Sequence, residues 1–136
     1  MSVRLSSPAS LMQPVPYHHV AVATGTRQVH VSGQIARDAD GTPLAPGDLA
    51  GQVAAALRNT HAGLASAGAG FADVVRLTFY VTGWAPERIE AFMTGVQAVA
   101  DEIGLPSPMP PASLIGVDFL FEPDVLVEVE ATAVLD

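Results

Sequence analysis

The apolar residues of this 136-residue chain follow two periods, one typical of strands and one of helices. Polar and apolar residues alternate along several stretches, which predicts strands. These stretches are residues 17–24, 27–35, 73–82, 112–121 and 125–135. The turn residues 24–26 (Thr-Gly-Thr) between the first two stretches predict that they pair as a hairpin.

Two further stretches repeat apolar residues every three or four positions, as amphipathic helices do. The first begins after Asp48, a candidate N-cap, and its stripe is Leu49, Val53, Leu57, Thr60 and Leu64. The second follows Pro86, and its stripe is Ile89, Phe92, Val96, Val99 and Ile103. The predicted order is ββαβαββ in a single α+β domain over residues 1–136, with residues 1–16 as an irregular arm. One mixed sheet would carry both helices on one face.

The other sheet face has a mixed character. It would present His30, Ser32, Arg76, Thr78, Tyr80, Glu128 and Glu130 beside Leu126 and Val134. Such a face is too apolar for water and too charged for a core. Pairing with other copies of the chain is the simplest arrangement, so we expect a homo-oligomer.

Charge and composition narrow the classes of partner. The net charge is −8, with six scattered arginines and no lysine, so no basic stripe could follow a nucleic-acid backbone. The negative electrostatic field of such a chain repels anions, so an anionic substrate would need a specific cationic or hydrogen-bonding partner in its site. The N-terminal segment lacks the apolar run of a signal peptide, and no stretch reaches the about 18 apolar residues of a membrane helix. We therefore expect a cytoplasmic protein that binds no membrane.

Three polar segments could carry chemistry, and each has a structural alternative. His18 and His19 would point to opposite sides of a strand, so at most one serves a given site as an acid or base. Gly33 marks either a close approach of another group or simple relief of crowding. Glu128 and Glu130 lie on one face about 7 Å apart. They could form an ion-pair network with Arg76, or one of them could activate water.

No metal or cofactor is expected. The histidines lie at positions 18, 19, 30 and 61 without the spacing of a metal motif, and there is no cysteine. The chain also lacks a phosphate-binding glycine motif and a GxSxG elbow.

Four motifs in order resemble the RidA (YjgF) family: PVPY at 14–17, VSGQI at 31–35, DVVRLTFYVT at 73–82 and LVEVEATAV at 126–134. The resemblance extends over residues 9–135. It implies a chorismate-mutase-like fold and a homotrimer whose sheets form a central barrel. It also implies a ligand cleft at each subunit interface, and no cofactor.

The resemblance further implies a hydrolase of reactive enamines and imines that releases ammonia, like the 2-iminobutanoate/2-iminopropanoate deaminases. Glu128 matches the glutamate that positions water, and Tyr17 the tyrosine of the cleft; these are the expected catalytic residues. Ser32 and Gly33 match cleft positions that bind substrate. The remaining expected substrate-binding residues are those at which this chain departs from the family: His18, His19, Ser113 and Ile115.

Ser113 is the departure with the largest consequence. It stands where the deaminases carry the arginine that binds the substrate carboxylate, and Ile115 stands where they often carry cysteine. A serine hydroxyl donates one neutral hydrogen bond in place of a bidentate charged contact. We therefore expect an altered substrate range, with weak or no activity on 2-aminoacrylate. The alternatives are a biosynthetic accessory enzyme, in which His18 or His19 does acid-base work, and a non-catalytic trimer that binds small molecules.

Overall fold

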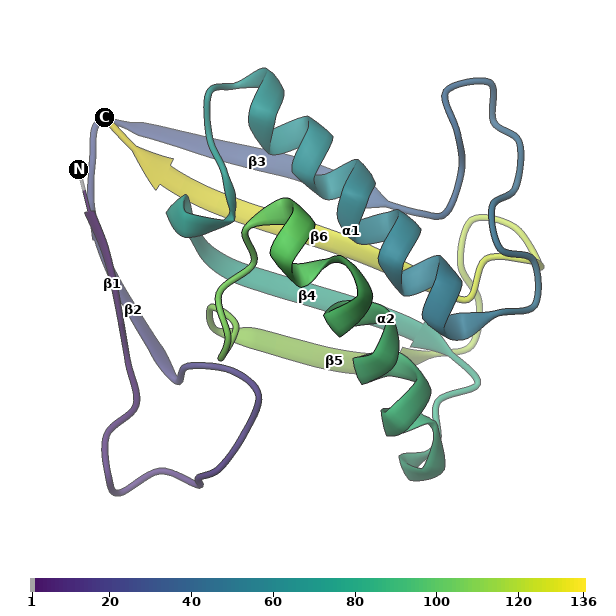
Figure 1. The fold of residues 1–136 in the computed structure, drawn as a ribbon, viewed down its shortest axis with the longest axis horizontal. Helices are drawn as coiled ribbons and strands as arrows, with labels where there is room; N and C mark the ends of the chain where they lie inside the picture. Colours follow the sequence, from purple (N-terminus) through teal and green to yellow (C-terminus); the bar gives the residue numbers. More distant parts are fainter. Residues whose placement is uncertain (1) are drawn as a thin grey trace.

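The computed structural model describes residues 2–136, and Met1 lies outside them. Six strands and two α-helices follow one another along the chain (Figure 1). The strands are β1 (Ser2–Ser6), β2 (Val20–Thr24), β3 (Arg27–Gln34), β4 (Val74–Thr82), β5 (Ala112–Val117) and β6 (Val127–Leu135). The helices are α1 (Leu49–Ser66) and α2 (Ile89–Ile103), with short 3-10 turns at Phe71–Asp73 and Pro86–Arg88.

The main sheet has four strands in the order β3-β6-β4-β5. β6 pairs antiparallel with both of its neighbours, whereas β4 and β5 run parallel. Both helices lie over one face of this sheet (Figure 1). The predicted α+β class, with a mixed sheet and two helices on one face, is therefore confirmed.

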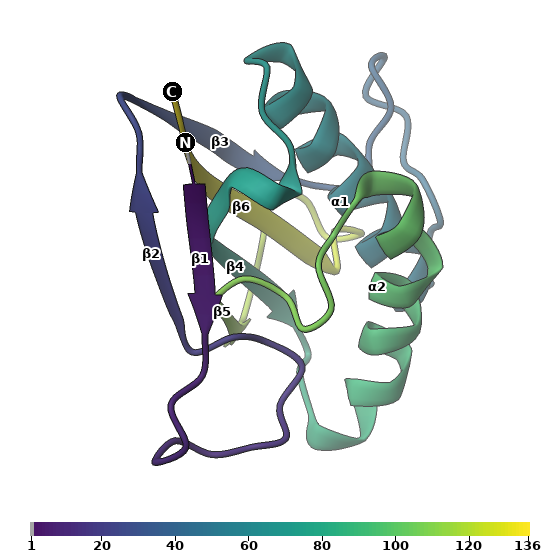
Figure 2. The same cartoon turned by 60° about the vertical axis from the view of Figure 1, so that its left-hand side comes forward.

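The predicted hairpin between residues 17–24 and 27–35 is wrong. β2 pairs antiparallel with β1, a strand inside the predicted irregular arm, and β3 pairs with β6. Figure 2 shows β1 and β2 as a separate two-stranded ribbon at one end of the main sheet. The chain passes from β2 into β3 at Gly25. A glycine fits there because a Cβ atom would lie only 2.8 Å from the Leu135 carbonyl oxygen.

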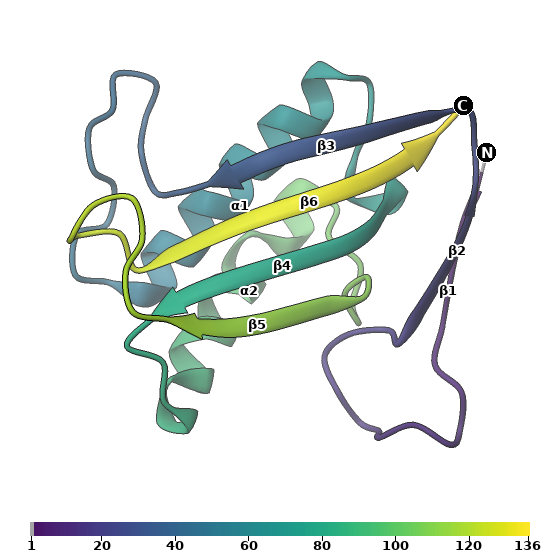
Figure 3. The ribbon, with the colours of Figure 1, turned by 180° about the vertical axis from the view of Figure 1, so that it is seen from behind.

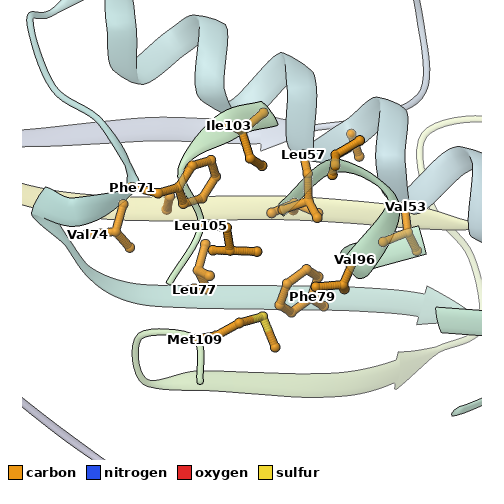
Figure 4. Packing of buried hydrophobic residues seen from close by; sticks show 14 of the residues in the cluster. Val53, Leu57, Phe71, Val74, Leu77, Phe79, Val96, Ile103, Leu105 and Met109 are labelled. Atoms are coloured by element: carbon orange, nitrogen blue, oxygen red, sulfur yellow. The ribbon is translucent and has the colours of Figure 1, made fainter. Parts of the chain in front are cut away.

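The helices bury the stripes that the sequence predicts, with one exception. All five stripe residues of α1 are buried, and in α2 only Ile89, at the first position, remains exposed. Asp48 occupies the N-cap position of α1 but makes no side-chain capping bond. Figure 4 shows the core between the helices and the sheet, where Leu57 and Val96 face Leu77 and Phe79.

The opposite face of the main sheet is uncovered in the single chain (Figure 3). β6 alternates strictly between buried odd-numbered and half-buried even-numbered residues. From Arg76 onward in β4, and throughout β6, the even-numbered side chains therefore point away from the helices, as predicted. Val74 lies before a shift in the β4–β6 register and is buried in the core instead. This surface is called the open face below.

Candidate functional site

A hollow of about 510 Å³ lies on the open face. Its walls come from three adjacent strands, β3, β6 and β4. The lining residues are His30, Val31, Ser32, Arg76, Thr78, Glu130, Ala131 and Thr132. The sequence placed these polar side chains on one face, and strand pairing brings them together across the sheet.

Gly33 makes room for the Glu128 carboxylate. The pairing of β3 with β6 is irregular between Val31 and Gln34, and this irregularity brings Gly33 against Glu128. A Cβ atom at position 33 would lie 1.9 Å from Glu128 Oε2 and 2.5 Å from its Cδ. Of the two alternatives for Gly33, the structure therefore shows a close approach, and the approaching group is the expected catalytic carboxylate.

The two glutamates of β6 differ in their partners. Glu130 Oε1 accepts a hydrogen bond of 2.8 Å from the Tyr80 hydroxyl. This bond raises the pKa of the Tyr80 phenol above its ordinary value, and burial and the charges of Glu130 and Glu128 act in the same direction. Within residues 2–136, no hydrogen bond or ion pair engages the Glu128 side chain. Of the two glutamates, Glu128 is thus the one without a side-chain hydrogen bond in the described chain.

Arg76 does not pair with either glutamate. Its Nη2 donates to Ser113 Oγ at 2.5 Å, across the β4–β5 pair. The ion-pair network that the sequence left open is absent from the part of the chain that the structure describes. The guanidinium instead contacts Ser113, the residue that stands where the resemblance expected an arginine.

Tyr17 lies beside the start of β5. It forms an isolated bridge with Met109, supported by hydrogen bonds from His18 N to Met109 O (2.7 Å) and from Met109 N to Pro16 O (2.9 Å). Tyr17 and Ser113 line one apolar pocket of about 250 Å³. The rest of its lining is Met12, Val15, Pro16, Phe79, Ile89, Phe92, Met93, Met109, Ala112 and Leu114.

The two histidines lie between Tyr17 and β2, which begins only at Val20, so the prediction that they alternate within a strand is wrong. His18 lines a second small pocket together with Tyr17. The His19 ring packs edge-on against Tyr17 at 5.3 Å and contacts the Met12 carbonyl through Nε2 at 2.8 Å. Neither lines the hollow of the open face.

A single chain does not bring all the expected site residues together. Ser32, Gly33 and Glu128 lie toward the β3 edge of the sheet, whereas Tyr17 and Ser113 lie at the β5 edge. Ile115, also on β5, is exposed and stands opposite Tyr80. Strand order, which the sequence pattern does not fix, separates the two groups.

Buried polar contacts hold the segments next to Glu128 and Gly33. Gln52 of α1 is buried, donates to the Asp124 carbonyl (3.0 Å) and accepts from Leu126 N (2.9 Å), just before β6. Asn59 of the same helix donates to the carbonyls of Ile35 and Arg37, just after β3, at 2.9 Å each. Helix α1 therefore fixes the backbone at both sides of the Gly33–Glu128 contact.

Arg37 links the two loops at that end of the sheet. Its guanidinium binds both oxygens of Asp124, at 2.8 and 2.9 Å, and Glu122 at 3.0 Å. The hydrogen bonds from Arg37 lower the pKa of Asp124, and those to Asp124 and Glu122 raise the pKa of Arg37. Sequence reasoning missed this pair and the Tyr80–Glu130 pair, because partners 87 and 50 residues apart leave no local signal.

Among residues 2–136, no cluster of three or more histidine or carboxylate side chains could hold a metal ion. In the same residues, no helix combines the length and apolar character needed to cross a membrane.

Comparisons with known proteins agree on one family. Residues 8–135 match the family described as endoribonuclease L-PSP. The chain is 38% identical over 102 residues to the RutC family protein YjgH of Escherichia coli (strain K12), which covers 74% of this chain and 72% of that protein.

Solved structures give the same result. The conserved Rid family protein YyfB of Yersinia pestis, whose function is unknown, has a TM-score of 0.87 at 35% identity, covering 99% of this chain and all of that one. E. coli TdcF, solved with bound serine, has a TM-score of 0.68 at 26% identity. The match covers 98% of this chain and 94% of the TdcF chain. The E. coli YjgF gene product has a TM-score of 0.66 at 28% identity. The match covers 95% of this chain and 93% of the YjgF chain. The chain therefore belongs to the Rid (YjgF) family, the family of the endoribonuclease L-PSP description.

Proposed function

We propose that this protein hydrolyses reactive enamine or imine intermediates and releases ammonia, with a substrate range that differs from that of the arginine-bearing deaminases. The observation that carries the proposal is the Gly33–Glu128 contact. A glycine is needed at position 33 to admit the carboxylate, and Glu128 has no partner among residues 2–136. Glu128 is half-buried, and a carboxylate that is buried for a structural role is normally hydrogen-bonded.

The reaction assigns a simple role to Glu128. Its carboxylate takes a proton from water as the hydroxide attacks the carbon of the C=N bond, giving a carbinolamine. The carbinolamine is complete once this proton has passed from Glu128 to the nitrogen. The proton of its new hydroxyl group then also moves to the nitrogen, the C–N bond breaks, and ammonia leaves as the carbonyl forms. The sum is an imine plus water giving a ketone or keto acid plus ammonia, with no redox step and no cofactor.

The site is proposed to form between subunits of a homotrimer. Tyr17 and Ser113 lie at the β5 edge and Glu128 lies toward the β3 edge, so one chain cannot place them around a single small molecule. A cleft between the β5 edge of one copy and the β3 side of the next would contain both groups. The exposed Ile115 on the open face supports a contact with another copy.

The substrate range follows from the apolar pocket beside Tyr17. Aromatic and methionine side chains line it, including Phe79, Phe92 and Met109. A bulky apolar substituent would gain free energy by leaving water there, whereas the small 2-aminoacrylate would leave the pocket empty. The serine bound to TdcF supports an amino-acid-like ligand for this fold.

The test is ammonia release from imines generated enzymatically in the presence of the protein. The panel contains 2-aminoacrylate and the imines derived from alanine, leucine and phenylalanine. The proposal predicts acceleration over spontaneous hydrolysis for the leucine and phenylalanine imines and little or none for 2-aminoacrylate. No acceleration with any imine would overturn it.

A further inference from the structure

Residues 7–16 form a loop between β1 and Tyr17, here called the N-terminal loop, and Figure 2 shows it beyond the lower ends of β1 and β2. Three residues of this loop, Met12, Val15 and Pro16, line the apolar pocket together with Tyr17. One wall of the pocket therefore comes from an irregular segment. The shape of the pocket depends on where that segment is held.

The hydrogen bonds within the N-terminal loop are local. Leu11 N and Gln13 Nε2 both donate to the Pro8 carbonyl, at 3.1 and 3.0 Å. These bonds curl the loop, but they do not attach its Met12 segment to the rest of the molecule. That attachment needs a group from outside the loop.

His19, two residues beyond Tyr17, attaches the loop at two points. Its backbone N–H donates to Ser7 Oγ at 3.2 Å, where the loop begins. Its ring Nε2 lies 2.8 Å from the Met12 carbonyl oxygen. Because a carbonyl oxygen only accepts, Nε2 carries the hydrogen and donates it. This contact occupies the Nε2–H group and disfavours the acid-base role that the sequence left open for His19.

The same imidazole ring also contacts Tyr17. The two rings pack edge to face, with 5.3 Å between their centroids and 70° between their planes. Tyr17 is held in turn by its bridge to Met109, just before β5. One imidazole thus joins the Met12 wall of the pocket to Tyr17.

We propose that His19 is a positioning residue that determines specificity: it holds the N-terminal loop beside Tyr17 and so keeps the wall of the apolar pocket in place. The inference rests on the proposed function, in which this pocket receives the apolar substituent of the substrate. It adds the residue on which the preference for a bulky substituent depends. Without the bond from His19, the Met12 wall would lose its fixed position and a large substituent would lose part of its contact.

The test measures the binding of two keto acids that differ in their apolar group. 4-Methyl-2-oxopentanoate is the product expected from the leucine-derived imine, and pyruvate carries only a methyl group. Calorimetry gives the Kd of each acid for the wild type, His19→Phe and His19→Gln. His19→Phe keeps a ring against Tyr17 but removes the donor to Met12, whereas His19→Gln keeps an N–H donor and is the matched control. Circular dichroism and light scattering check that each variant keeps the fold and the mass of the wild type.

His19→Phe should bind 4-methyl-2-oxopentanoate about three- to tenfold more weakly than the wild type, as expected for the loss of one hydrogen bond that holds the wall. Its affinity for pyruvate should be unchanged, because a methyl group gains little from the Met12 wall. His19→Gln should bind both acids as the wild type does. Unchanged binding of 4-methyl-2-oxopentanoate by His19→Phe, or an equal loss for both acids in both variants, would overturn the inference.

A second measurement follows the loop itself. Hydrogen exchange at the Leu11 amide, which donates to the Pro8 carbonyl, should be faster in His19→Phe than in the wild type. In His19→Gln it should keep the wild-type rate, and the amides of β6 should be unaffected in both variants. The same rate at Leu11 in all three proteins would contradict the attachment of the loop by His19.

Neither measurement depends on hydrolysis. A selective loss of 4-methyl-2-oxopentanoate binding in His19→Phe, with no imine hydrolysed by the wild type, would support the role of His19 and contradict the proposed reaction. Hydrolysis of the leucine-derived imine with the same KM in the wild type and His19→Phe would support the reaction and contradict the role of His19.

Discussion

At the scale of single residues, the contact between Gly33 and Glu128 decides where the carboxylate points. Replacing Gly33 by alanine would put a methyl group at the place of Glu128 Oε2, so the carboxylate must move. Because misplacement of a reacting group by about 1 Å can cost on the order of a hundredfold in rate, we predict a loss of that size for Gly33→Ala in the ammonia-release assay.

Gly70 supplies the control for this substitution. A Cβ atom there would meet nothing within 4 Å, and its backbone is extended, so Gly70→Ala should keep wild-type activity. A fully active Gly33→Ala protein would show that the position of Glu128 does not matter for the reaction.

At the scale of elements, the loops after β3 and before β6 are joined by the Arg37–Asp124 pair. Because the pKa of Asp124 is lowered in the folded state, the pair stabilises the protein above the ordinary aspartate pKa of about 3.9. This contribution is lost as the pH falls through the lower folded value. We predict that Asp124→Asn melts below the wild type at about pH 7 and that the difference shrinks as the pH falls below the ordinary aspartate pKa.

Glu102→Gln is the comparison for this pH dependence. Arg58 likewise lowers the pKa of Glu102, but both partners are about half exposed, at 51% and 54%, whereas Arg37 is only 12% exposed. Solvent screens the exposed pair more strongly, so Glu102→Gln should change the melting temperature less. A difference between Asp124→Asn and wild type that is the same at every pH would contradict the account.

The elements themselves were largely predictable, and their partners were not. The apolar stripe of α1 and the alternation of β6 arise because one side of each element is buried in the core. This one-sided burial is visible in the local sequence as a repeat of apolar residues. The pairing of β2 with β1 depends instead on a bend at Gly25 against Leu135, far away in sequence. For the same reason the strand pattern alone marked Gly33 and Glu128 separately, and only the family resemblance assigned them to one cleft. The pattern also placed Arg76 on the open face but gave no sign of its contact with Ser113.

At the scale of the whole molecule, the proposed trimer explains why the open face mixes apolar and charged residues. Ile115 is 45% exposed on this face in the single chain. We predict that Ile115→Glu lowers the mass measured by light scattering from three chain masses toward one, and that hydrolytic activity falls with it, because the cleft needs two copies.

Gln97→Glu makes the same change of charge on the outer surface of α2, away from the open face, and should alter neither the mass nor the activity. An Ile115→Glu protein that stays trimeric would contradict the assignment of Ile115 to the interface. A monomer with full activity would contradict a cleft shared between copies.

The charge of the molecule also bears on the family description, which names an endoribonuclease. A net charge of −8 disfavours the phosphate contacts that supply most of the affinity of proteins for nucleic acids.

The most direct test of the central claim is the rate of hydrolysis of the leucine-derived imine by Glu128→Gln. Glutamine keeps the size of the side chain beside Gly33 but cannot take a proton from water. The account predicts a loss of about 10² to 10⁴ in kcat, the usual contribution of a general base, with unchanged binding of 4-methyl-2-oxopentanoate. A Glu128→Gln protein that hydrolyses the imine at the wild-type rate would contradict it.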